Sequence, residues 1–91
     1  MEAQIIGKQL LRSATSVAAN YRAAGRARSK AEFFSKLSIV VEEADEVLFW
    51  LELIKESNLY PMPDLDPIIK EATELLYIFS SSRKTAKVNL T

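Results

Sequence analysis

Apolar side chains recur every three or four residues along most of this chain, which is the spacing of one face of an α-helix. The first such stripe consists of Ile6, Leu10, Ala14, Val17, Tyr21 and Ala24. It weakens at Gly25, where a helix can end at little cost, so the pattern predicts a helix over residues 4–25. Within this segment Ser13, Thr15 and Ser16 are small, which indicates close packing by a neighbouring helix.

A second helix is predicted over residues 29–57. Ser29 is a typical N-cap, and Glu32 three positions later completes a capping box. The apolar residues then form two adjacent rows, one of Phe33, Leu37, Val40, Ala44, Val47, Leu51 and Ile54, the other of Phe34, Val41 and Leu48. Because its C-terminal half is apolar almost all round, this helix must bury more than one face.

A third helix is predicted over residues 65–86. Asp66 followed by Pro67 is a good helix start, with the aspartate as cap and the proline at the first helical position, and Asp64 is an alternative cap. The apolar stripe of this helix consists of Ile68, Ala72, Leu75 and Phe79, with Ile69 and Leu76 beside it.

The breaks between these segments are short. Pro61 and Pro63 keep the residues before them out of the helical region, and residues 87–91 lose the apolar pattern and are expected to fray. No segment alternates with a period of two. The chain is therefore predicted to be a single all-α domain over residues 1–91, an up-down helical bundle with three helices.

Composition removes several classes of function. The chain has no cysteine and no histidine, which excludes disulfides, Cys or His nucleophiles and the usual zinc sites. Glu42 and Glu46 lie one turn apart, but no histidine or matching inward carboxylate completes a metal site. We therefore expect no enzymatic activity, no metal, no cofactor and no small-molecule substrate. With no signal peptide and no apolar run of membrane-spanning length, a cytoplasmic location is expected and a membrane partner is not.

The net charge of zero hides a strong segregation of charge. Residues 1–41 carry seven basic and two acidic side chains, residues 42–74 carry ten acidic and two basic, and residues 75–91 carry three basic. The candidate nucleic-acid-binding residues are Arg12, Arg22, Arg26, Arg28 and Lys30, because guanidinium groups suit phosphates. The alternative is that this basic turn pairs with the acidic segment of a neighbouring subunit.

The apolar surface exceeds what three helices of this length can cover, which favours a homo-oligomer. A monomer with a wide core is the alternative. The candidate oligomer or helix interface residues are Asn20, Tyr21, Phe49, Trp50, Leu53 and Phe79. The amide of Asn20 is either an interface hydrogen-bonding group or an ordinary surface amide, and Trp50 is interpreted as a core or interface residue.

Several segments together resemble a known family. They are QLLRSATSVAANYRAA at residues 9–24, RARSKAEF at 26–33, EEADE at 42–46, FWLEL at 49–53 and KTAK at 84–87. Over about residues 5–87 the chain resembles the bacterial four helix bundle protein family, also called the 23S rRNA intervening-sequence protein family. The resemblance implies an up-down four-helix bundle similar to a ring-forming, pentameric assembly, with no established enzymatic activity.

In that family another helix normally precedes the segment that starts here near Gln4. The three predicted helices therefore correspond to the last three of the four, and the absent one would cover apolar surface. A structurally similar relative, the basic pentameric accessory protein of diversity-generating retroelements, is implicated in nucleic-acid binding. The resemblance thus implies a self-assembling scaffold or binding module with RNA or DNA as ligand. The alternative is a purely structural protein–protein interaction module.

Overall fold

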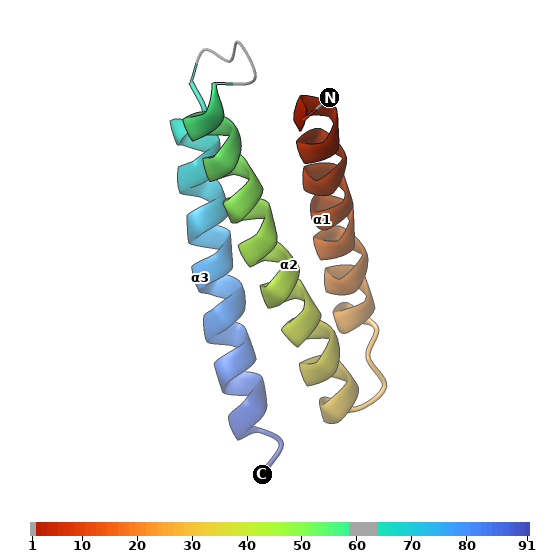
Figure 1. Cartoon of the computed structure of the whole chain (residues 1–91). Coiled ribbons are helices and arrows are strands. Elements are labelled where there is room, and N and C mark those ends of the chain that lie inside the picture. The colour runs from red at the N-terminus through yellow and green to blue at the C-terminus, as the bar shows by residue number, and fades with distance from the viewer. Residues whose placement is uncertain (1, 59–63) are drawn as a thin grey trace.

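The computed structural model describes residues 2–58 and 64–91 and consists of three helices. They are α1 (Glu2–Gly25), α2 (Lys30–Ser57) and α3 (Asp66–Val88). The chain runs down α1, up α2 and down α3, so the α1–α2 turn and the C-terminus share the lower end of the molecule (Figure 1). The shape is elongated, 47 × 21 × 15 Å. The described residues contain no strand, and the predicted all-α bundle is confirmed.

The start of α2 follows the predicted capping signal. Ser29 has an extended backbone with φ −155°, and its Oγ accepts a hydrogen bond of 3.0 Å from the N–H of Glu32. This bond satisfies one of the first-turn donors that lack an intrahelical partner. The reciprocal bond of the capping box differs from the prediction. The carboxylate of Glu32 accepts from the N–H of Arg28, at 3.4 Å, and not from that of Ser29.

The start of α3 corrects one prediction. Asp66 is the first residue of the helix and not its cap, and the residue in the N-cap position is Leu65, which has no side-chain oxygen to offer. Asp64, the alternative cap, accepts a hydrogen bond of 2.9 Å from the N–H of Asp66. The carboxylate of Asp66 instead forms an ion pair, with its Oδ1 2.6 Å from Nζ of Lys55 near the end of α2.

The helix ends lie close to the predicted positions. α2 ends at Ser57, and Asn58 adopts the left-handed conformation with φ 57° that often terminates helices. Pro61 and Pro63 lie outside the described residues. α3 continues two residues beyond its predicted end, to Val88, so the first residues of the expected tail are helical.

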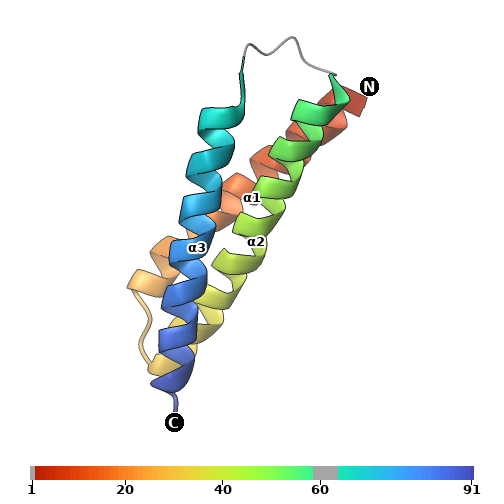
Figure 2. The ribbon, with the colours of Figure 1, turned by 90° about the vertical axis from the view of Figure 1, so that its left-hand side faces the viewer.

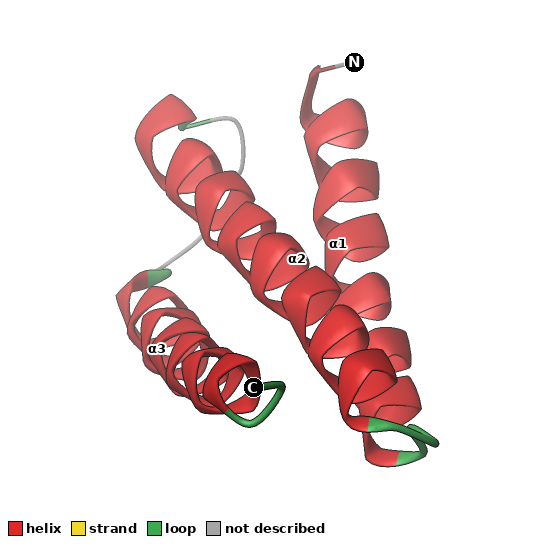
Figure 3. Ribbon diagram, turned by 90° about the horizontal axis from the view of Figure 1, so that it is seen from below, coloured by secondary structure: helices red, strands yellow, loops and turns green. Residues whose placement is uncertain are grey.

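The core is formed on two sides of α2, which lies between α1 and α3 when the molecule is viewed from below (Figure 3). Its upper half centres on a cluster of Ile6, Ile54 and Leu65, and its lower half on a cluster of Leu37, Val40 and Ala86. Val40 is completely buried. The prediction that α2 buries more than one face is therefore confirmed.

In the described part of the chain, no helix has an apolar stretch long enough to cross a bilayer.

α1 and α3 pack against α2 without their backbones approaching each other. Between them lies an apolar groove, which we call the α1–α3 groove, with hollows of about 140 and 240 Å³. Its lining includes Val17, Tyr21, Val47, Leu75, Ile78 and Phe79. The rings of Tyr21 and Phe79 meet across it, with their centroids 5.7 Å apart.

The groove explains why parts of two predicted apolar stripes are exposed. Ala14 and Tyr21 of α1 are exposed, and so are Ile68 and Leu75 of α3. Ala14, Tyr21 and Leu75 line the groove between α1 and α3, whereas Ile68 is not among its lining residues. The contact of α3 with α2 uses Ile69 and Phe79 from the predicted rows, together with Leu65 at the N-cap and Ala86 near the C-terminal end. The stripe pattern correctly identified helices, but it placed too much of α3 in the core.

The end of α1 gives a prediction about stability. Gly25 does not have a positive φ, and a Cβ atom added there would meet no atom within 4 Å. Gly25→Ala should therefore raise the free energy of unfolding by about 0.4–1 kcal/mol, because alanine reduces the entropy of the unfolded chain. Urea denaturation followed by circular dichroism measures this change. A destabilised variant would show that the helix end depends on the conformational freedom of glycine.

Candidate nucleic-acid interface

The down-up-down path of the chain brings its two basic segments to one end of the molecule. The α1–α2 turn and the last turns of α3 both lie at the lower end in two perpendicular views (Figures 1 and 2). We call this the basic end, with the charged residues Arg22, Arg26, Arg28, Lys30, Lys36, Arg83, Lys84 and Lys87 and the single carboxylate Glu32. The rest of the chain carries eleven acidic and four basic side chains. Three charge blocks in the sequence thus become two oppositely charged parts of the fold.

Four cations of the basic end surround a shallow hollow of about 490 Å³ between the end of α1 and the start of α2. They are Arg22, Arg26, Arg28 and Lys36. Among the described residues, Arg22, Arg26 and Lys36 make no ion pair. The Arg28 side chain is 90% exposed, and its Nε lies 3.7 Å from Oε2 of Glu32, which is a weak surface pair. These cations are therefore accessible to an anionic ligand.

Lys36 was not among the predicted binding residues. It follows Glu32 by one helical turn, so both lie on the same side of the start of α2, and Arg28, which precedes the N-cap, lines the same hollow. That spacing could have identified it. Lys30 lies at the same end of the molecule but lines a different hollow, on the side of the turn that faces α3.

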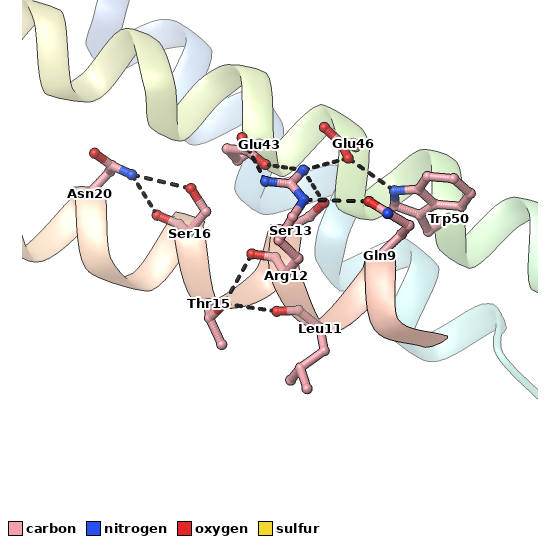
Figure 4. A network of polar contacts seen from close by, with 10 residues as sticks. All are labelled: Gln9, Leu11, Arg12, Ser13, Thr15, Ser16, Asn20, Glu43, Glu46 and Trp50. Carbon is pink, nitrogen blue, oxygen red and sulfur yellow. Dashed lines mark hydrogen bonds and ion pairs between the residues drawn. The ribbon is translucent and has the colours of Figure 1, made fainter. Parts of the chain in front are cut away.

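Arg12, the fifth predicted binding residue, is not brought together with the others. Its Nη2 lies 2.6 Å from Oε1 of Glu46 and 3.0 Å from Oε2 of Glu43, so it joins α1 to the middle of α2 (Figure 4). The same nitrogen donates to Oγ of Ser13, at 3.1 Å. Its two acidic partners lie more than thirty residues away in the sequence. Only the antiparallel packing of the helices reveals the pair.

Glu46 is the centre of this polar network. Hydrogen bonds from Arg12, and then from Trp50 and Ser13, lower the pKa of Glu46, while the bonds to the carboxylates raise the pKa of Arg12. Nε1 of Trp50 donates to Oε1 of Glu46 at 3.2 Å. The carboxylate of Glu46 is thus engaged in a contact between α1 and α2.

Across residues 2–58 and 64–91, no three potential ligand side chains lie close enough together to hold a metal ion.

The small residues of α1 have different roles. Ser13 is completely buried, as expected where two helices pack closely. Thr15 is exposed, and its hydroxyl donates to the backbone carbonyl of Leu11 at 2.9 Å, so its prediction as a packing residue is wrong. Ser16 is half-buried and accepts from the side chain of Asn20.

The predicted interface residues fall into two groups. Nδ2 of Asn20 donates to the carbonyl oxygen and to Oγ of Ser16, at 2.9 and 3.2 Å, so the amide nitrogen has its partners within its own helix. Tyr21 and Phe49 are 58% and 55% exposed. These two rings are thus accessible, although Phe49 also meets the ring of Trp50 edge-on.

The other three predicted interface residues pack between helices of the same chain. Trp50 and Leu53 lie against the upper core cluster, and Phe79 lies against the lower one. All three are half-buried. They therefore contribute to the contacts that α2 makes with its neighbours.

Arg83 positions the basic residues of α3. Its guanidinium carbon lies 4.8 Å from the centre of the Phe34 ring, and its Nε donates to Oγ of Ser38 at 2.8 Å. A cation over an aromatic face is stabilising. This contact fixes the last turns of α3 against α2 and so holds Lys84 and Lys87 at the basic end.

The lowered pKa of Glu46 predicts a specific dependence of stability on pH. The contribution of its ion pair is present above the ordinary carboxyl value of 4.5 and is lost as the pH falls through the lowered pKa. Glu46→Gln should therefore melt below the wild type at neutral pH, with the difference shrinking as the pH falls below 4.5. Thermal unfolding across this range measures it, with the exposed Glu52→Gln as control. A constant difference at every pH would contradict the assignment.

The comparisons with known proteins agree with this fold. The family model described as 23S rRNA-intervening sequence protein matches residues 1–81. A crystal structure of a protein of unknown function from the S23 ribosomal protein family of Bacteroides thetaiotaomicron VPI-5482 is also similar. It has 38% sequence identity and a TM-score of 0.79, over 88% of this chain and 71% of that one. A search of curated proteins finds no match. The resemblance inferred from the sequence motifs is thus confirmed, and the chain belongs to the 23S rRNA-intervening sequence protein family.

Proposed function

We propose that this protein is a non-enzymatic binding module that holds single-stranded RNA at its basic end. The observation that carries the proposal is the meeting of two basic segments, distant in the sequence, around the α1–α2 turn and the end of α3. Eight cations face a single carboxylate there. The absence of histidine and cysteine from the sequence supports a binding role over a catalytic one.

The chemistry of the basic end suits a phosphodiester backbone. Lysine and arginine bind phosphates and release counterions, which gives salt-sensitive and sequence-tolerant binding. The guanidinium groups of Arg22, Arg26 and Arg28 offer paired donors that match phosphate oxygens. The matching family is described as 23S rRNA-intervening sequence proteins, so RNA is the first polyanion to test.

The proposal predicts the salt dependence of binding. The logarithm of the affinity should fall with the logarithm of salt concentration, with a slope of about −0.7 for each phosphate contacted on a single strand. Removing two contacts with Arg26→Gln and Arg28→Gln together should make the slope shallower by about 1.4. Fluorescence anisotropy of a labelled RNA at several salt concentrations measures it.

The control variant is Lys8→Gln with Lys70→Gln, which removes the same charge outside the basic end. It should leave the slope within error of the wild type, because neither lysine belongs to the proposed contact. Failure to bind RNA at low salt would overturn the proposal. Equal effects of the two double variants would show attraction by net charge alone.

A second candidate function is a purely structural module that pairs with a second copy of the chain. The α1–α3 groove favours it, because Tyr21, Leu75 and Ile78 are 58%, 44% and 54% exposed along an apolar depression. An antiparallel arrangement places the basic end of one copy beside the acidic part of the other. Such complementarity guides orientation as well as contact.

Light scattering tests this second candidate. The wild type should have a mass that is a multiple of 10.2 kDa, and a ring of five copies, expected from the resemblance, would be distinguished from a pair. Ile78→Glu places a charge in the groove and should reduce the mass to that of one chain. Tyr77→Glu, at a neighbouring position that is 74% exposed and is not part of the groove lining, is the control. A single-chain mass for the wild type would contradict self-association.

The two candidates respond differently to charge reversal at the turn. If the basic end binds RNA, Arg26→Glu with Arg28→Glu lowers RNA affinity and leaves the mass unchanged. If the basic end pairs with a second copy, the same variant lowers the mass. Measuring both quantities on one preparation separates the candidates.

A further inference from the structure

A second and larger hollow lies on the side of the α1–α2 turn that faces α3. We call it the turn pocket. Its volume is about 740 Å³, which is within the range of about 300–1,000 Å³ found for small-molecule sites. The residues that give it chemical character are Arg28, Lys30, Phe33, Ser82, Thr85 and Asn89. They come from the turn, the first turn of α2 and the last turns of α3.

The lining of the turn pocket combines three kinds of group. Its charged residues, Arg28 and Lys30, are both cations, and no carboxylate side chain is among its lining residues. Phe33 is a large apolar side chain that remains 39% exposed there. Ser82 and Thr85 of α3 and Asn89 at its C-cap add hydrogen-bonding groups. A ligand with an anionic group and a flat, partly polar ring would use all three: the cations would bind the anion, Phe33 would contact the ring, and the hydrogen-bonding side chains would contact its polar atoms.

Arg28 connects the turn pocket to the shallow hollow of Arg22, Arg26 and Lys36, since it lines both. A chain of phosphates that passes from one hollow to the other therefore crosses the turn at Arg28. A single small anion could occupy only one of them. This continuity favours a nucleotide within a strand over a free nucleotide.

We infer that the turn pocket takes one unpaired nucleotide of the bound strand, with its base against the ring of Phe33 and its phosphate beside Arg28 and Lys30. This inference rests on the proposed function, because it assigns one nucleotide of the same RNA. Stacking of bases on aromatic side chains is a common mode of single-strand recognition, and it tolerates different bases because each has a π face.

The test separates the contribution of the base from that of the phosphate. The probes are an oligoadenylate RNA of about 12 nucleotides and a strand of equal length and charge whose bases are replaced by abasic spacers. The RNA should bind at least about fivefold more tightly than the abasic strand, since one base–aromatic stack has about that effect. Phe33→Leu should remove this preference and leave the affinity for the abasic strand unchanged.

Two further variants provide the controls. Phe33→Tyr keeps an aromatic ring and should retain the preference for the RNA. Phe49→Leu removes an exposed ring of α2 that is not part of the turn pocket and should change neither affinity. Thermal melting of each variant confirms that it is folded, and Phe33→Tyr keeps the test valid if Phe33→Leu is unstable.

The outcomes distinguish this inference from the proposed function. Equal affinities for the two strands, or a Phe33→Leu effect that is the same on both, would overturn the inference while the basic end still binds RNA. Failure of both strands to bind at low salt would overturn both. Adenosine monophosphate should compete poorly, because it cannot reach both hollows. Competition as strong as that of the RNA would overturn the assignment to a strand.

Discussion

The structure depends on one helix that is apolar on two sides. α2 buries Leu37, Val40, Leu51 and Ile54, and the other two helices meet it without meeting each other through their backbones. The position of α1 relative to α3 is therefore set through α2. Two core clusters, one in each half of α2, fix these contacts along its length.

Polar contacts at three positions along α2 align the neighbouring helices, which apolar packing alone does not do. Lys55 holds the start of α3, Arg12 holds the middle of α1, and Arg83 holds the last part of α3. All three side chains are at least partly accessible to solvent, so their polar contacts contribute only modestly to the free energy of unfolding. Their larger effect is on the alignment of α1 and α3 with α2. The antiparallel path of the chain brings both basic segments to the same end, and Arg12 and Arg83 align α1 and α3 along α2.

The sequence predicts the features that depend on near neighbours. The helices, the cap at Ser29 and the two-sided character of α2 follow from spacings of a few residues, and the structure agrees. Arg22, Arg26, Arg28 and Lys30 are consecutive cations around one turn, so their proximity follows from the sequence, but the sequence does not show that Lys30 lines a different hollow from Arg22 and Arg26. Features that depend on which helix packs where could not be predicted. The pairing of Arg12 with Glu46 and the joining of the turn to the end of α3 require the path of the whole chain.

The separation of charge along the molecule has a consequence for how a strand would meet it. Electrostatic attraction reaches only about 10 Å at moderate ionic strength, and the acidic part of the chain repels phosphates over most of its 47 Å length. The long axis of the protein would therefore point away from a bound polyanion and not run along it. Its footprint would follow its cross-section of 21 × 15 Å, which is less than half of its length in each direction. Many copies could then crowd side by side on a short length of RNA.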